Sequence, residues 1–396
     1  MNRSILTKTI ILITTGLLLL AVSLWVIYMR HRERYAMEPV SFEKRVTAAW
    51  PIAGGDSQLT GFTMLIPAKP KVLWRYRASA SISAGPVSDN GRIFFGDNEK
   101  TFYCLDLETG RLIWKTEIPG GVTASALLVD DLCYFGSSEG VFYAVSVSDG
   151  SIKWTFNIKE QINGSANSFK IEDKLYVVFG GYDFKLHCLQ AKNGREVWSV
   201  PTGNFINGTP AISNGRIIFG GCDGFLRFVD AATGKETGKV KLKSYIPASP
   251  AIYDITVYAA IYDQKLFAFD IGDEVEKWVF DGNKDSGPFL ASPAVNKDYV
   301  VIAERNGTVS FVKREDGLSS GSFKVSGEIT VRPVISDTQC LVADKDGYLY
   351  IHDIPSGKRV WRYQSGPEIA AQPAVCGDKI IIADTDGNIT VFKGTN

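Results

Sequence analysis

A tryptophan recurs along this chain at steps of 40 to 44 residues. It ends a short phrase, complete at Asp106, Thr109, Gly110 and Trp114, in which a glycine lies four residues before the tryptophan. Glycine adopts positive φ readily and a threonine hydroxyl can bond to the backbone of a turn, so the phrase predicts a tight turn leading into a strand. The turn glycines are Gly110, Gly150, Gly194, Gly234 and Gly357, and the tryptophans, which we expect to be structural docking residues, are Trp74, Trp114, Trp154, Trp198, Trp278 and Trp361.

Two further columns repeat in the same register. A small residue closes a hydrophobic strand at Gly96, Gly136, Gly180, Gly220, Ala260, Ala303, Ala343 and Ala383. A proline or alanine precedes the first strand of each repeat at Pro86, Ala126, Ala166, Pro210, Pro250, Pro293, Pro333 and Pro373. Repeats of about 40 residues, each with several short strands, are typical of β-propellers. We therefore expect an all-β fold, an eight-bladed propeller of four-stranded antiparallel blades.

The two ends of the repeat array are incomplete in complementary ways. The strand around Trp74 has no repeat before it, and the last repeat stops after Phe392 without a tryptophan strand. We expect the first strand to complete the last blade, because ring closure removes exposed sheet edges. The propeller is predicted to span residues 72–396. Gly238 and Gly321 occupy the tryptophan position in two of the repeats.

An uncharged apolar stretch covers residues 10–29. Twenty helical residues span about 30 Å, the thickness of a bilayer core. A cleaved signal peptide is the alternative, but its apolar run is usually shorter and ends at small residues, whereas Trp25 to Met29 stand here. We expect a short tail at 1–9, a transmembrane helix acting as a signal anchor at 10–29, and a linker with a lead-in at 30–71.

Three segments outside the regular repeats are candidates for special roles. The lead-in contains Trp50-Pro51, Gly54-Gly55-Asp56 and Thr60-Gly61-Phe62, and we expect Trp50 and Phe62 to pack on the outside of the ring. Two repeats carry extra residues, around 167–173 and within 280–289. Such insertions are expected in loops, where they form a binding face or have drifted neutrally.

The phrase from Asp106 to Trp114 resembles the tryptophan-docking repeat of the pyrroloquinoline-quinone-like β-propellers. The lead-in is similar to the segment that opens many of these proteins, so the resemblance covers residues 49–396. It implies one of two functional classes. One comprises quinoprotein dehydrogenases that bind the quinone and Ca²⁺ in the channel, and the other comprises cofactor-free scaffolds that resemble the outer-membrane assembly lipoprotein B and bind protein partners.

The residues needed by the dehydrogenase class are missing from the sequence. The alcohol-dehydrogenase branch of that class stacks its quinone between a tryptophan and a disulfide of two adjacent cysteines, but the six cysteines here are separated: Cys104, Cys133, Cys188, Cys222, Cys340 and Cys376. We expect these to be core thiols. Few residues suit histidine-based acid–base catalysis, since the only histidines are His31, His187 and His352. We expect no catalytic, cofactor-binding or metal-binding residues and no cofactor.

The sequence thus favours a membrane-anchored, non-catalytic propeller scaffold that binds protein partners in the cell envelope. A quinone-dependent dehydrogenase and a membrane-tethered ligand sensor remain the alternatives. No nucleic-acid partner is expected, because the 43 basic and 43 acidic residues give zero net charge. The basic residues after the apolar stretch favour a cytoplasmic propeller, but long domains translocate largely regardless of such charges. We expect an inner-membrane protein with an extracytoplasmic propeller. No cysteine precedes Cys104 to carry the lipid anchor of the assembly lipoprotein.

Overall fold

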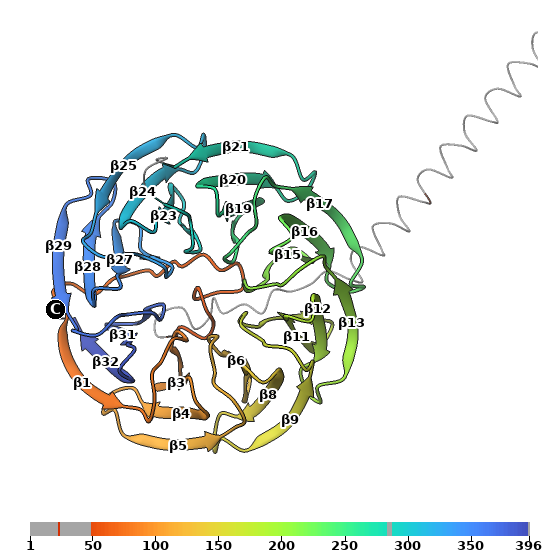
Figure 1. Ribbon diagram of the computed structural model, residues 1–396, viewed down its shortest axis with the longest axis horizontal. Coiled ribbons are helices and arrows are strands. Elements are labelled where there is room, and N and C mark those ends of the chain that lie inside the picture. The colour runs from red at the N-terminus through yellow and green to blue at the C-terminus, as the bar shows by residue number, and fades with distance from the viewer. Residues whose placement is uncertain (1–22, 24–48, 283–286, 395–396) are drawn as a thin grey trace, which may run out of the picture.

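The computed structural model describes residues 23, 49–282 and 287–394. Its strands form eight four-stranded antiparallel sheets arranged around a ring (Figure 1). The predicted all-β, eight-bladed propeller is confirmed. The predicted transmembrane helix at 10–29 lies outside the described residues apart from Ser23. Among the residues that the structure describes, no helix is both long enough and apolar enough to cross a bilayer.

Within each blade the strands run outward from the axis of the ring to its rim, in chain order except in the last blade. The first four blades are β2 (Val87–Asp89), β3 (Arg92–Gly96), β4 (Thr101–Asp106) and β5 (Leu112–Glu117); β6 (Leu127–Val129), β7 (Leu132–Gly136), β8 (Val141–Ser146) and β9 (Ile152–Asn157); β10 (Asn167–Ile171), β11 (Lys174–Gly180), β12 (Lys185–Gln190) and β13 (Glu196–Pro201); and β14 (Ala211–Ser213), β15 (Arg216–Gly220), β16 (Phe225–Asp230) and β17 (Glu236–Lys241).

The remaining four blades follow the same plan. They are β18 (Ala251–Tyr253), β19 (Thr256–Ile261), β20 (Lys265–Asp270) and β21 (Glu276–Asp281); β22 (Ala294–Val295), β23 (Tyr299–Ala303), β24 (Thr308–Lys313) and β25 (Ser319–Lys324); β26 (Val334–Ile335), β27 (Gln339–Ala343), β28 (Tyr348–Asp353) and β29 (Arg359–Gln364); and β30 (Ala374–Cys376), β31 (Lys379–Ala383), β32 (Asn388–Lys393) and β1 (Lys71–Arg77).

Burial along the strands follows from this arrangement. The second and third strands are apolar and almost wholly buried, as in β3, because blades cover them on both sides. Rim strands such as β9 alternate between exposed and half-buried residues. The core lies between adjacent blades. Phe102 stacks on Phe135 of the next blade, and Phe142 stacks on Phe179 of the one after, each pair with ring centroids 4.0 Å apart.

The ring closes through the two ends of the array. β1 pairs antiparallel with β32, and Trp74 lies opposite Val391. In Figure 1 the orange β1 lies beside the blue β32 at the rim of the last blade. The edge of β32 that would otherwise face solvent is therefore paired.

The expectation that the lead-in packs on the outside of the ring is wrong. Trp50 is buried and Phe62 pairs with Ile335 of the innermost strand β26. The lead-in crosses the centre of the ring, where it appears in orange-red in Figure 1. It bonds to the innermost strands of seven blades, through Ser88, Leu128, Asn167, Ile212, Ile252, Val295 and Ile335. Innermost strands have an unpaired edge toward the axis, and the lead-in backbone satisfies it.

The insertion at 167–173 is not the loop that the sequence suggested. Residues Asn167–Ile171 form β10, and the extra residues lengthen the hairpin that β10 makes with β11. These strands have five and seven residues, against three and five in β2 and β3. Two residues added to each strand preserve the side-chain alternation, so the insertion extends the pairing without disturbing it. The other insertion, 280–289, lies partly outside the described residues.

Candidate partner-binding face

Tryptophan docking joins one blade to the next at five junctions of the rim. Trp74 of β1 donates its indole N–H to the Leu107 carbonyl of the next blade, at 3.0 Å. The same bond joins Trp114 to Val147, Trp154 to Ala191, Trp198 to Ala231 and Trp278 to Arg314, at 2.9–3.1 Å. Each indole also covers a turn glycine. A Cβ on Gly110 (φ +71°) would come within 2.6 Å of the Trp74 ring, and Gly150, Gly194 and Gly234 stand in the same relation to the preceding tryptophan.

The two blades with glycine in the tryptophan position dock differently. At the junction beside Gly238, Glu274 stands at the position where other blades have the turn glycine. Its carboxylate occupies the space that a side chain on Gly238 would need. Arg216 pairs with Glu274 at 3.2 Å and donates to the Ile271 carbonyl, the acceptor that a tryptophan uses elsewhere. Next to Gly321, the Pro355 backbone fills the space, so Gly357 contacts Ser322 rather than an indole.

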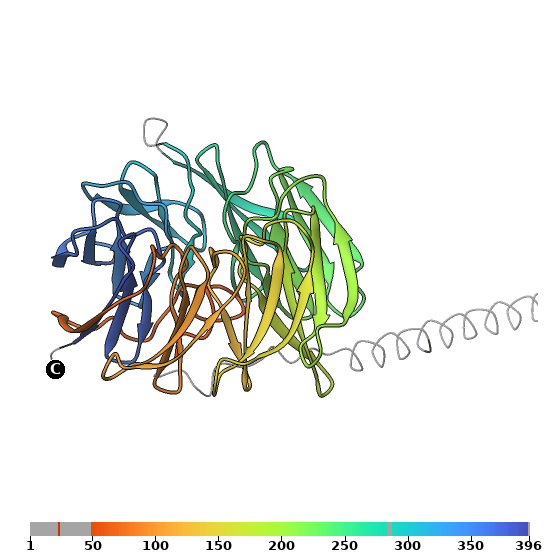
Figure 2. The same ribbon diagram turned by 60° about the horizontal axis from the view of Figure 1, so that its bottom comes forward.

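The docking residues lie at the face that carries the turns between third and fourth strands. The opposite face carries the hairpins between second and third strands together with the crossovers that lead from blade to blade; we call it the crossover face (Figure 2). The backbone of this face is uniform. In all eight blades the residue after the fourth strand donates its N–H to the hairpin tip, as Ile118 does to Lys100 and Thr202 does to Phe184. Differences between blades on this face therefore lie in the side chains.

One part of the crossover face is aromatic. Tyr182 stacks on Phe205 with centroids 4.2 Å apart, Phe184 meets Phe205 edge-on at 5.1 Å, and Tyr245 stacks on Tyr262 at 4.7 Å. Phe184 is 41% exposed and Tyr245 36% exposed. We call these five residues of the third to fifth blades the aromatic sector. The sector consists of two ring clusters, one of Tyr182, Phe184 and Phe205 and one of Tyr245 and Tyr262. Exposed aromatic groups of this kind mark interaction sites.

Equivalent positions in the later blades are charged. Arg305 pairs with Glu328, and Lys345 pairs with Glu368, both at 3.2 Å. Backbone hydrogen bonds show that these positions are equivalent. The N–H of Tyr262 donates to the carbonyl of Tyr245, and in the later blades the N–H of Arg305 donates to Pro288 and that of Lys345 to Glu328. The fold itself therefore accepts ion pairs where the aromatic sector has rings.

Phe184 has an unfavourable backbone conformation. It lies at the hairpin tip with φ +64°, a region that a bulky side chain rarely adopts. Five other blades have glycine at this position: Gly140, Gly224, Gly307, Gly347 and Gly387. Phe184 is thus both strained and exposed where glycine would serve the fold, and such outliers concentrate at functional sites.

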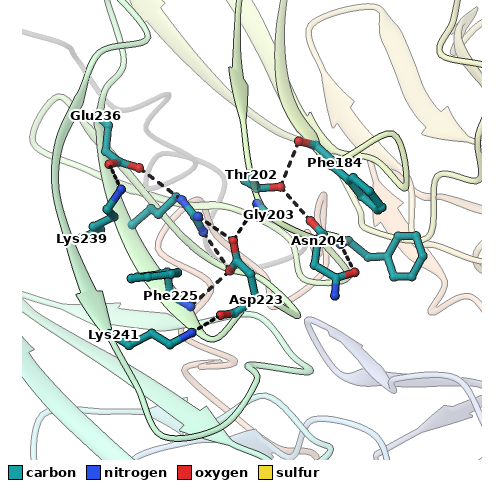
Figure 3. Close-up of polar contacts among 11 residues, drawn as sticks. Phe184, Thr202, Gly203, Asn204, Asp223, Phe225, Glu236, Lys239 and Lys241 are labelled. Atoms are coloured by element: carbon teal, nitrogen blue, oxygen red, sulfur yellow. Dashed lines mark hydrogen bonds and ion pairs between the residues drawn. The ribbon is translucent and has the colours of Figure 1, made fainter.

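A polar network beneath the sector fixes the Phe184 tip (Figure 3). Buried Arg227 donates to both carboxylate oxygens of Asp223, at 3.0 and 2.5 Å, and pairs with Glu236 at 3.2 Å. Asp223 also accepts the N–H of Gly203 at 2.9 Å, next to Thr202, whose N–H bonds to the Phe184 carbonyl. Burial alone would raise the pKa of Asp223, but the bonds from Arg227 and Gly203 hold that pKa below its ordinary value.

The third blade repeats this arrangement with a histidine. His187, in the position of Arg227, lies between Asp183 and Glu196, with its ring nitrogens 2.9 and 2.8 Å from their carboxylate oxygens. Asp183 belongs to the same hairpin as Phe184. His187 is thus a structural anchor, and His352 occupies the third strand of the seventh blade.

The centre of the ring does not fit the quinone cofactor. The lead-in backbone occupies it, and Arg332, 4% exposed, packs against Gly54 of that segment. Burial raises the pKa of Asp56, opposed by hydrogen bonds from Thr60 and by the charge of Arg332. The cysteines are free thiols in separate positions, so none offers the paired platform of the dehydrogenases. Over the described residues, no cluster of three or more His, Cys, Asp or Glu side chains suits a metal ion.

Comparisons with known proteins identify the repeat. A family model described as "Outer membrane protein assembly factor BamB" matches residues 63–202, 162–239, 183–319 and 283–396. These matches together run through residues 63–396, well over half of the chain. The chain belongs to this family. The resemblance to the pyrroloquinoline-quinone-like propellers is thereby confirmed, although the lead-in before residue 63 is outside the matches.

Solved structures share the fold of this BamB-type chain. BamB from Moraxella catarrhalis is 19% identical, with a TM-score of 0.69 over 83% of this chain and 99% of that one. The computationally designed Ika8 protein is 17% identical, with a TM-score of 0.71 over 83% and 99%. A europium-containing methanol dehydrogenase is 11% identical, with a TM-score of 0.75 over 88% and 98%. No curated protein matches the sequence significantly.

The tryptophans predicted from the sequence do not lie on the candidate partner-binding face. The six tryptophans lie on rim strands, and their docking contacts are at the face opposite the aromatic sector. The sequence pattern did not predict Phe184 as a site residue, because Phe184 differs from the residues that the repeats share. The signal was nevertheless present, since aligning the hairpin tips shows one aromatic residue among glycines, Lys100 and Gln264.

Proposed function

We propose that this chain is a membrane-anchored, non-catalytic scaffold that binds a protein partner through the aromatic sector of its crossover face. The observation that carries the proposal is Phe184, a strained and exposed aromatic residue at a position where five blades have glycine. Exposed aromatic anchors on a rigid support are the residues that dominate binding energy in protein interfaces.

The family gives the proposal its setting. Its name refers to an assembly factor for outer-membrane proteins, and we extend that role to this chain as part of the proposal. The anchor is the apolar stretch at 10–29, with the propeller on the extracytoplasmic side of the inner membrane. An alkaline phosphatase fused after Asn396 is expected to be active and a fluorescent protein fused there dark; the reverse pattern would place the propeller in the cytoplasm.

The dehydrogenase alternative is supported by fold likeness to the methanol dehydrogenase. The central lead-in and the separated cysteines argue against it. Added pyrroloquinoline quinone with Ca²⁺ is therefore expected to give neither saturable binding nor dye-linked alcohol oxidation. A saturable quinone site with turnover would replace the scaffold proposal by this one.

Site-specific photo-crosslinking tests the scaffold directly. A photoreactive amino acid at position 184 of the full chain, in the native host, is expected to capture a defined envelope protein of the outer-membrane assembly pathway. The control position is Lys100, the equivalent and exposed hairpin tip of the first blade. Equal capture from both positions, or none from position 184, would refute binding through the aromatic sector.

A further inference from the structure

The aromatic sector has lysines along one border. Lys185 directly follows Phe184, and Lys241 and Lys243 lie at the end of the rim strand β17 and just beyond it, before Tyr245. All three lysines are exposed. Strand alternation places Lys239, Lys241 and Lys243 on one face of this segment, while Val240 and Leu242 turn inward.

Most of the acidic groups nearby are paired within the protein, and none forms an ion pair with Lys185, Lys241 or Lys243 among the described residues. Asp223 accepts two bonds from Arg227, and Asp183 faces His187. Glu236 pairs with Arg227 and with Lys239. Asp263, an exposed carboxylate of the fifth blade, accepts a bond from Ser244. The lysine border therefore keeps its positive charge toward solvent beside the rings.

Three cations surround the aromatic ring of Phe225, and two of them, Arg227 and Lys239, are also ion-paired with acids. Lys241 lies 4.3 Å from the centroid of Phe225, Lys239 lies 5.5 Å from it, and Arg227 lies 5.1 Å from it (Figure 3). Lys241 also donates to the Asp223 carbonyl at 2.5 Å. The contact with the ring holds the Lys241 side chain in place without neutralising its charge. At the equivalent positions of the later blades the cations are ion-paired, Arg305 with Glu328 and Lys345 with Glu368.

We propose that the aromatic sector binds an acidic segment of the partner protein in which carboxylates accompany large apolar side chains. The apolar side chains pack on Phe184, Phe205 and Tyr245, and the carboxylates face Lys185, Lys241 and Lys243. This inference rests on the proposed function and specifies the chemistry of the partner. Charge complementarity selects among partners and accelerates encounter, while the aromatic anchors supply affinity.

The test is fluorescence anisotropy with the full-length protein in detergent micelles. The probe is a short labelled peptide in which glutamate alternates with phenylalanine and leucine. A second peptide has lysine in place of every glutamate, and a third has serine in place of every apolar residue. The glutamate–apolar peptide is expected to bind at least about tenfold more tightly than either of the others.

Variants locate the site. Lys185→Glu combined with Lys243→Glu is expected to weaken binding of the glutamate–apolar peptide about tenfold or more. Lys324→Glu is the matched control, since Lys324 is an exposed rim lysine of the sixth blade that pairs with Thr308 as Lys241 pairs with Phe225. That variant is expected to bind like the parent protein.

The outcomes separate the two proposals. If the lysine peptide binds as tightly as the glutamate–apolar peptide, the proposed preference for acidic segments is wrong. The scaffold proposal is then still decided by the crosslinking experiment. Loss of binding in Lys324→Glu would overturn the location. Failure of all three peptides to bind would overturn the inference, whereas the proposed function is decided by the crosslinking comparison of positions 184 and 100 and by the quinone assay.

Discussion

Arg216 Nη1 lies 3.2 Å from Glu274 Oε1, across the junction between the fourth and fifth blades. The pair occupies the place that a tryptophan and a turn glycine occupy at five other junctions. Glu274 takes φ +64° there, a conformation that suits glycine. At this junction the carboxylate of the turn residue Glu274 fills the space beside Gly238, where an indole and a turn glycine meet at the other five.

The coupling predicts non-additive mutations. Gly238→Trp alone would collide with Glu274, and Glu274→Gly alone would leave the space beside Gly238 empty, so each is expected to lower the unfolding free energy by about 1–3 kcal/mol. The double variant restores the docking pair, and its loss should be smaller than the sum by about 1–3 kcal/mol. Urea unfolding of the four proteins measures this. Additive losses would show that the two positions are independent.

Much of the ring followed from the sequence because it depends on residues that recur. Tryptophan, turn glycine and the strand-closing small residue mark backbone positions that every blade must satisfy, so their spacing was sufficient for blade number and strand order. The path of the lead-in was not predictable in this way. Trp50 looked like a surface residue because nothing in its local pattern reveals that the unpaired innermost strands, far away in the chain, require its backbone.

The docking tryptophans differ in burial, which predicts graded losses. Trp114 and Trp278 are buried, whereas Trp74 of the closing strand is half-buried. Trp114→Ala is expected to cost about 3–4 kcal/mol of unfolding free energy and Trp74→Ala about 1 kcal/mol less, since less apolar surface leaves water at that site. Chemical denaturation followed by circular dichroism measures both. A larger loss at Trp74 would mean that closure depends on the indole beyond its buried area.

Thiol chemistry should distinguish one cysteine from the other five. Cys104, Cys133, Cys188, Cys340 and Cys376 are buried and Cys222 is half-buried. Burial raises the pKa of Cys104 to about 12 and raises the pKa of Cys222 less completely, with a hydrogen bond from Asn207 opposing the rise. Because the thiolate is the reactive form, alkylation of the native protein is expected at Cys222 first. Mass spectrometry of peptides after brief iodoacetamide treatment checks this, and equal labelling of Cys340 would contradict it.

His352 gives stability a dependence on pH. Burial lowers the pKa of its imidazole, which donates to the Gly357 carbonyl at 2.9 Å and stacks on Phe323. The unfolded chain, with a histidine pKa of about 6.5, therefore binds protons that the folded chain does not. Stability from the neutral ring is full above that pH and falls as pH drops through the folded pKa. Thermal unfolding of His352→Gln should show a shallower loss between neutral pH and about pH 5 than the parent protein; equal slopes would remove His352 as the cause.

The ring could be predicted because its residues recur, whereas the candidate site could not be predicted because its residues do not. Phe184 and Tyr245 do not recur in the other repeats, and side chains that differ between repeats look like neutral surface variation in one sequence. Two physical facts made them informative. The structure showed that Phe184 takes a backbone conformation unsuited to it, and that two clusters of aromatic rings lie on one face.

Phe184→Gly tests the central claim most directly, because it separates folding from binding. Glycine fits φ +64° without strain, so the unfolding free energy should change by less than about 1 kcal/mol. In the same variant, a photo-crosslinker at the exposed position Tyr245 should lose the partner that it captures in the parent protein. A stable variant without the crosslink is the predicted result. A stable variant that still captures the partner would show that the aromatic sector is not the binding face.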